Sequence, residues 1–258
     1  MHTISVLSLK GGTGKSVTSD NIVYILAEVL KKKVLLIDND KQGNSSKTFG
    51  KYDAEDRNTI ARVMIEKNVD VEEIIKHTAY ENIDIITANM SLIEANLKVI
   101  MDMTSQQQRR FKNALQKVEA YYDYCIIDNA PDINMNIINA LAMTNDVIIP
   151  ISIDQYSFDG LEILIDQIEN TREDFNENIR IAGCLITQYE NNDVNNQGIE
   201  WLENWLKGRG LSVFAQRIRR TKEKVKESTF AQMPVVAYSP RCGASRDYRD
   251  FVYEYLSQ

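Results

Sequence analysis

Cysteine, proline and glycine are all scarce in this 258-residue sequence. The three cysteines, Cys125, Cys184 and Cys242, are widely spaced and form no C-x-x-C pair. This argues against a disulfide framework, a zinc knuckle or an iron–sulfur site. With only four prolines and eleven glycines, a long flexible linker is not expected. Residues 1–9 lack the pattern of a signal peptide, and no apolar run reaches the roughly eighteen residues of a membrane span. We therefore expect a cytoplasmic protein.

Positive charge is also in deficit, since the formal net charge is −7. An acidic total argues against a surface that is covered with nucleic-acid-binding charge. It leaves room for a local basic patch, because screening makes nearby charges matter most.

Short apolar runs alternate with helical patterns along the whole chain. The runs cover residues 4–9, 34–38, 83–88, 124–128, 147–151 and 181–187. Their length fits strands that are covered on both faces. Between the first two runs, residues 22–30 carry one apolar helical face, and residues 248–256 read as a last amphipathic helix. We expect one α/β domain over residues 1–258, with a mostly parallel sheet and helices on both faces.

A glycine-rich segment follows the first run and opens the first helix. It comprises Lys10, Gly11, Gly12, Thr13, Gly14, Lys15 and Ser16, and Val17 follows. Glycines allow a tight turn that presents several N–H groups to one anion, and the helix N-terminus adds partial positive charge. We expect Lys15 to reach the β- and γ-phosphates of a nucleotide and the Ser16 hydroxyl to bind Mg²⁺. The alternative is a glycine-rich turn with two solvated lysines.

Carboxylates stand where two other strands end. Asp38 and Asp40 follow the run VLLI, and Asp128 follows YCII. Ligands collect beyond the carboxyl ends of the strands in open α/β sheets. One of the first two carboxylates can act near the metal while the other orients water, and Asp128 is in the position to hold Mg²⁺. The alternative is that Asp40 begins a polar turn, where aspartate is common.

The segment K-G-G-x-G-K-[ST] resembles the deviant Walker motif of the ParA/MinD/nitrogenase-iron-protein superfamily. The resemblance is densest over residues 3–160. It implies that Lys10 reaches the nucleotide of a partner subunit, so that ATP holds a homodimer together, and that Asp40 positions the attacking water. This sequence departs from the family by carrying Lys41 in place of a proline and Asn129-Ala130 after Asp128.

A basic segment stands out in the last third of this acidic chain. Its members are Arg217, Arg219, Arg220, Lys222, Lys224 and Lys226. Such a local patch suits non-specific DNA binding, which the family resemblance also implies for the ATP-bound dimer. The alternative is a solvated helical face. By the same resemblance, the adenine contacts would come from Gln188, Arg219 and Thr221, although the proline usual in the family here is absent.

Together these features predict a Mg²⁺-dependent ATPase that segregates plasmid, chromosome or mobile-element DNA and associates with the nucleoid. The resemblance implies a ParB-like centromere-binding partner that stimulates weak hydrolysis. A membrane role is disfavoured, because the last helix has mixed charge and no basic amphipathic tail follows it. The competing hypothesis is a nucleotide-dependent regulatory or scaffold protein that binds a protein partner without DNA transport.

Overall fold

A seven-stranded sheet forms the centre of the protein in the computed structural model. The structure describes residues 1–258, except the side chains of Gln155, Tyr156, Ser157, Asp159 and Lys222. The strand order is β3-β4-β2-β5-β1-β6-β7, and every neighbouring pair is parallel except the edge pair β3–β4. The strands are β1 His2–Val6, β2 Val34–Asn39, β3 Lys76–His77, β4 Ile83–Ile86, β5 Tyr124–Asn129, β6 Asp146–Ile151 and β7 Arg180–Ile186.

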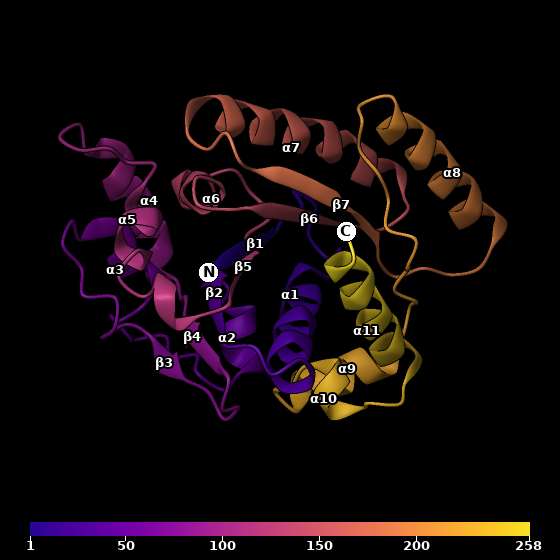
Figure 1. Cartoon of the computed structure of the whole chain (residues 1–258), viewed down its shortest axis with the longest axis horizontal. Helices are drawn as coiled ribbons and strands as arrows, with labels where there is room; N and C mark the ends of the chain where they lie inside the picture. The colour runs from indigo at the N-terminus through magenta and orange to yellow at the C-terminus, as the bar shows by residue number, and fades with distance from the viewer.

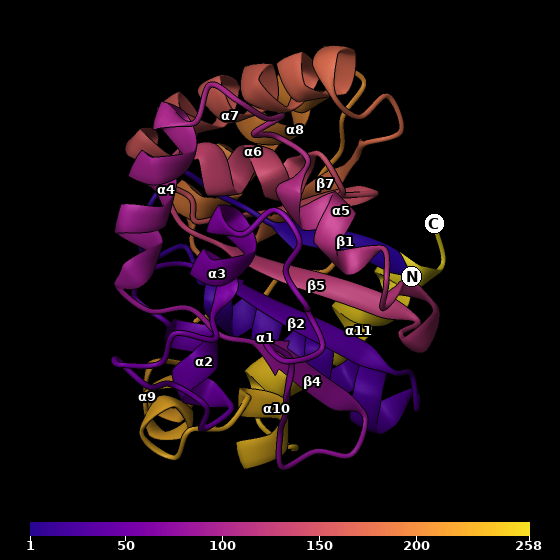
Figure 2. The ribbon, with the colours of Figure 1, turned by 90° about the vertical axis from the view of Figure 1, so that its left-hand side faces the viewer.

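Helices cover both faces of this sheet (Figure 1). One face carries α1 Lys15–Tyr24, α10 Val235–Tyr238 and α11 Gly243–Leu256. The other face carries α3 Ile60–Ile65, α4 Ser91–Met101, α5 Arg110–Leu115, α6 Met135–Leu141, α7 Gln155–Asp174 and α8 Asp193–Lys207. The short helices α2 Asn44–Thr48, η2 Glu119–Tyr121 and α9 Lys222–Phe230 complete the chain. Figure 2 shows the sheet between these two layers.

Alternation along the strands creates the two cores. In β2, Leu36 packs toward α1 and α11, whereas Leu35 and Ile37 pack toward α3 and α4. All three side chains are fully buried. Successive strand residues point to opposite faces, so a strand covered on both sides reads as a continuous apolar run. The expected mostly parallel sheet with two helical layers is confirmed.

Most strand ends fall within two residues of the sequence-based expectation, and the larger differences concern the first strand, the first and last helices and β3. The first strand ends at Val6 rather than at residue 9, because the chain turns there into the glycine-rich segment. The first helix already begins at Lys15 and passes into a π-helical turn over Ile25–Val29. The last helix begins five residues earlier than expected, at Gly243. Strand β3 was not predicted, since two residues carry no periodic signal.

The parallel pairing brings the carboxyl ends of β1, β2 and β5 together at one edge of the sheet. In the registers, Asp128 lies opposite both Val6 of β1 and Asp38 of β2. The glycine-rich segment leaves β1 at the same edge. The candidate site is therefore assembled where the topology of open α/β sheets places ligands. Among the described residues, no helix has both the length and the apolar character needed to cross a bilayer.

Candidate functional site: a phosphate loop above a buried carboxylate pair

The glycine-rich segment forms an open loop that leads into α1. Gly12 and Gly14 have φ angles of 80° and 82°, a left-handed conformation that favours glycine. Gly14 caps α1, and its carbonyl accepts a hydrogen bond from Thr18 N at 2.8 Å. The Lys15 ammonium turns back over the loop and donates to the Lys10 carbonyl at 3.0 Å. This is the backbone geometry of an anion-binding loop at a helix N-terminus.

Residues that follow β7 hold this loop in place. Thr187 Oγ1 donates to the Thr13 carbonyl at 2.8 Å, and both residues are buried. Gln188 Nε2 donates to the Gly12 carbonyl at 2.5 Å, and Gln188 itself has a φ of 53°. Two carbonyls of the loop are thereby engaged by residues that also line the cavity.

Asp38 and Asp128 form a buried carboxylate pair beneath the loop. Asp38 accepts hydrogen bonds from Ser46 N and Ser46 Oγ, both at 2.7 Å. Asp128 accepts from Ser19 Oγ at 3.2 Å and from Ser45 Oγ at 2.9 Å. Burial, and then the charge of Asp128, raises the pKa of Asp38. Burial also raises the pKa of Asp128, although hydrogen bonds from Ser16 and Ser45 act against the shift. Two carboxylates buried close together favour a nearby cation, which offsets their mutual repulsion.

Asp40 lies apart from this pair, in the wall of the cavity. It is 7% exposed, and its Oδ1 accepts a hydrogen bond from Gln42 N at 2.9 Å. Gly43 N donates to the Asp40 carbonyl at 2.9 Å, which closes a turn over residues 40–43. The structure thus separates the two aspartates of the D-x-D segment: one is buried with Asp128, and the other faces the cavity.

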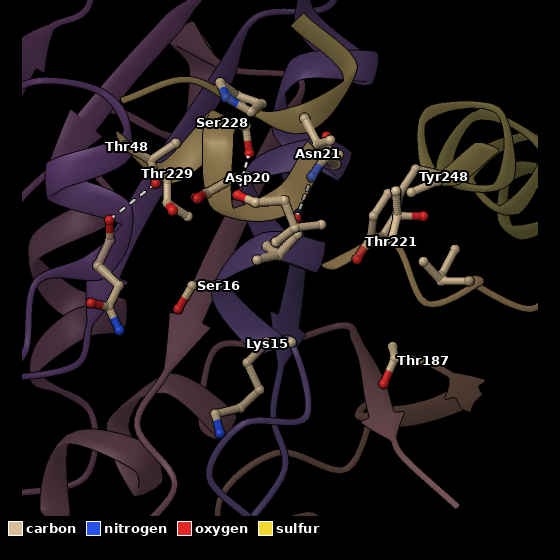
Figure 3. Close-up of a pocket in the computed structure, with 18 of the residues that line it drawn as sticks. Lys15, Ser16, Asp20, Asn21, Thr48, Thr187, Thr221, Ser228, Thr229 and Tyr248 are labelled. Carbon is tan, nitrogen blue, oxygen red and sulfur yellow. Dashed lines mark hydrogen bonds between the residues drawn. The ribbon is translucent and has the colours of Figure 1, made fainter. Parts of the chain in front are cut away.

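The cavity has a volume of about 710 Å³ and runs from the phosphate loop to α9 and α11. Its described lining includes Gly11, Gly12, Gly14, Lys15, Ser16, Val17, Asp40, Gln188, Arg219 and Thr221. Of the predicted nucleotide contacts, all line this cavity except Lys10 and the fully buried Thr13. Figure 3 shows Lys15 and Ser16 at one end, with Tyr248 on one side and Thr48 on the other. Lys15 is only 8% exposed, and burial lowers the pKa of its ammonium, although nearby carboxylates oppose the shift.

Lys10 is placed differently from Lys15. Its ammonium forms an ion pair with Asp154, in the segment that follows β6. Among the residues with described side chains, Lys10 does not line the nucleotide cavity, whereas the adjacent Gly11 does. The Lys10 ammonium is thus engaged by Asp154 of its own chain and does not line the cavity.

The basic segment is only partly free to attract phosphate. Arg219 is held by Asp247 through two contacts of 2.7 Å, and Arg220 contacts Glu190 at 2.7 Å. Three further members differ in their surroundings: Lys224 contacts Glu227, Arg217 lies 3.9 Å from Glu203, and Lys226 is exposed at the cavity rim. The side chain of Lys222 lies outside the described residues. The acidic partners of Arg219 and Arg220 come from distant parts of the chain, which the sequence pattern did not reveal, whereas Glu227 lies only three residues after Lys224.

Several site residues were missed by reasoning from the sequence. Ser45 and Ser46 hold the buried carboxylates, and Thr187 holds the phosphate loop. Asp20 on α1 lies 2.6 Å from Ser45 Oγ, and burial raises its pKa well above the usual range. A lone hydroxyl or an acid within a helix gives no signal of this kind. Only Ser45 and Ser46 could have been suggested by the sequence, because they follow the D-x-D segment closely.

The sheet order and the phosphate loop at the carboxyl end of β1 define a P-loop nucleotide-binding protein. The AAA domain family model matches residues 1–181. The sporulation initiation inhibitor protein Soj of Bacillus subtilis is 32% identical over 251 residues, covering 97% of this chain and 96% of Soj. The chain therefore belongs to the ParA/MinD-type P-loop ATPases, the family that contains Soj.

Solved structures share the fold at lower identity. A putative plasmid partition protein from Borrelia burgdorferi bound to AMPPNP has a TM-score of 0.80 at 22% identity, covering 99% of this chain and 98% of that one. Cobyrinic acid a,c-diamide synthase from Mycobacterium smegmatis, with bound ATP analog and magnesium, has a TM-score of 0.83 at 23% identity. The match covers 99% of this chain and 94% of the synthase. Because proteins with such different activities share this fold, the function must be argued from the site.

Proposed function

We propose that this protein is a Mg²⁺-dependent ATPase whose ATP-bound dimer binds DNA without sequence preference and segregates a DNA cargo. The proposal rests on the residue roles below and on the kinship with Soj. The observation that carries it is the position of Lys10, which lies beside the phosphate loop but outside the cavity of its own subunit.

The first role is phosphate binding. Lys15 and the glycines of the loop line the cavity, and Lys15 is nearly buried. In a site with little water, an ammonium–phosphate contact is stronger than at the surface. Lys15 would therefore hold the β- and γ-phosphates. Val17, Gln188, Arg219 and Thr221 line the part of the cavity that remains for the nucleoside.

The donor set fits Mg²⁺. Ser16, Asp38 and Asp128 offer oxygen ligands, and the buried carboxylates gain by meeting a cation. Within the described side chains, no cluster of three or more His, Cys, Asp or Glu residues could hold a metal ion by itself. Mg²⁺ does not require such a cluster, since it is usually bound by one or two carboxylates together with phosphate oxygens. When bound, the ion would neutralise charge that develops on the phosphates.

Asp40 would orient the attacking water. Its carboxylate stands in the cavity wall and is steered by the Gln42 amide. A carboxylate in that place can accept a hydrogen bond from water and direct it at the γ-phosphate. Removal of this group would leave the phosphate contacts of Lys15 untouched, so binding and turnover should separate.

Lys10 would couple ATP to dimerisation. A facing subunit could receive its ammonium on the phosphates, because the side chain does not line its own cavity. A charge-assisted contact of this kind would let ATP, but not ADP, favour the dimer. The dimer would then present two copies of the basic segment, from Arg217 to Lys226, to DNA. A ParB-like partner that stimulates weak hydrolysis, and a cytoplasmic location on the nucleoid, belong to the same proposal.

A DNA-affinity measurement tests the proposal as a whole. Fluorescence anisotropy on a random-sequence duplex should show binding with Mg-ATP and little binding with Mg-ADP or without nucleotide. The Asp40→Ala variant serves to keep ATP intact during the measurement. If the protein hydrolyses ATP but its DNA affinity is the same with ATP, with ADP and without nucleotide, the proposed ATP-dependent DNA binding is refuted.

One observation favours a second function, that of a nucleotide-dependent regulatory or scaffold protein. Arg219, Arg220 and Lys224 already face carboxylates within the chain, which weakens the field available to DNA. Absence of DNA binding in all nucleotide states, together with intact ATP binding, would support this second function.

A further inference from the structure

Two loops at the carboxyl edge of the sheet begin beside a cluster of three buried amides. The first follows β2 and carries Asp40; the second follows β5 and carries Asp132. Asn39 Nδ2 donates to Asn129 Oδ1 at 2.9 Å, and Asn136 Nδ2 donates to Asn39 Oδ1 at 3.1 Å. Asn39, Asn129 and Asn136 are at most 1% exposed. These contacts tie the elements that carry the three amides, although Asn136 Oδ1 is buried without a described donor.

An ion pair joins the same two loops at their outer ends. Lys41 Nζ lies 3.2 Å from Asp132 Oδ2, and the side chains are 37% and 38% exposed. Lys41 occupies the second position of the turn over residues 40–43. It directly follows Asp40, whose carboxylate orientation depends on the Gln42 amide of that turn. A contact that orders the turn therefore also orders the Asp40 carboxylate.

We propose that Lys41 and Asp132 are positioning residues for ATP hydrolysis, which hold the turn so that Asp40 meets the attacking water. This inference rests on the proposed ATPase activity. Asp132 is suited to the task, because Pro131 restricts the backbone before it and lines the cavity. Its Oδ1 is buried, and no described residue donates a hydrogen bond to it. The carboxylate thus keeps acceptor capacity for a second contact from the Lys41 ammonium.

The size of the effect follows from the exposure of the pair. Half-exposed ion pairs contribute at most about 1 kcal/mol, which corresponds to about a fivefold change in the population of the ordered turn. Loss of the pair should therefore lower kcat by roughly two- to fivefold. The ATP dissociation constant should change much less than kcat, since neither residue hydrogen-bonds to Lys15 or the phosphate loop, and Asp132 acts on the Lys15 ammonium only after Asp128 and Asp40.

The test combines a disruption with a rescue by a different kind of constraint. Asp132→Asn removes the charge and keeps the shape. Lys41→Pro, at the second position of the turn, restrains the same backbone covalently, because proline fixes φ at about −65° and is favoured at the second position of type I and II turns. Asp132→Asn alone should lower kcat, and adding Lys41→Pro should restore it. A residue that acts only in stability would give no such rescue of kcat at constant ATP affinity.

Two controls make the result decisive. Lys98→Met removes a surface lysine that pairs with Glu94 on α4, and it should leave kcat and ATP affinity unchanged. The exchanged pair Lys41→Asp with Asp132→Lys should recover most of the activity. Unchanged kcat in Asp132→Asn would overturn the inference, as would a weaker ATP affinity at constant kcat, which would make Lys41 a phosphate ligand. Failure of the proposed ATPase activity can be told apart from failure of this inference, because in the first case the unmodified protein would show no hydrolysis.

Discussion

Replacement of Lys10 by alanine provides a quantitative test of the dimer. In the structure the Lys10 ammonium faces Asp154 of its own chain, and the side chains are 32% and 37% exposed. Leaving this partner costs at most about 1 kcal/mol, because exposed ion pairs are weak. A charge-assisted hydrogen bond to phosphate contributes about 1.5–3 kcal/mol. Taking the upper part of that range, the net gain is about 1.5 kcal/mol for each lysine.

Two-fold symmetry doubles this gain. Two lysines together contribute about 3 kcal/mol, so Lys10→Ala should weaken the ATP-bound dimer by roughly 150-fold. Nucleotide affinity of the monomer should be retained, because Lys10 is not among the described residues that line its own cavity. Asp154→Ala removes the competing partner and should leave the dimer intact or slightly tighter. Lys98→Ala is the matched control for the loss of one surface lysine.

The assay is molar mass by light scattering over a range of protein concentrations with Mg-ATP. Asp40→Ala serves as the common background, so that turnover does not empty the site. A Lys10→Ala variant that dimerises with the dissociation constant of its parent would show that the lysine does not act across subunits. Equal dimerisation of the parent with ATP and with ADP would refute the ATP-dependent dimer itself, whatever the role of Lys10.

Four further outcomes are expected. Asp40→Ala should keep ATP affinity and lose turnover, which separate binding and hydrolysis assays would show; full hydrolysis would remove this residue from the reaction. Thr187→Val should weaken ATP binding about fivefold in titration calorimetry, since the buried Thr13 carbonyl loses its donor, and unchanged affinity would mean that the loop needs no such support. Joint replacement of Arg220, Lys224 and Lys226 should lower the log–log salt slope of DNA binding by about one unit per lost phosphate contact, whereas an unchanged slope would indicate a solvated face. The ligand-free protein should become less stable to heat as the pH rises from about 5 to about 8, because the raised pKa of Asp38 lets the folded state hold a proton that the unfolded state releases. Asp38→Asn should flatten this pH dependence. A rise in stability over the same range would contradict the pKa shift.

Much of the fold could be predicted because its signals are local. Strands that are buried on both faces are continuous apolar runs, and six of the seven strands were found in this way. The phosphate loop was recognisable because its chemistry needs glycines, a lysine and a hydroxyl within a few consecutive residues. The missed strand β3 and the π-helical turn have no comparable pattern, since each depends on neighbours that the sequence does not identify.

The tertiary structure alone decided which side chains meet. Asp38 faces Asp128 because β2 pairs with β5, although 90 residues separate the neighbouring partners Asn39 and Asn129. Thr187 reaches the phosphate loop across 174 residues. The fold also decides how much positive charge the basic segment offers to a ligand, because it brings Asp247 and Glu190 against Arg219 and Arg220. The sequence by itself determined the local chemistry, because a motif is a run of neighbours. Distances between remote carboxylates, hydroxyls and cations follow from strand order and helix packing, which no single segment encodes.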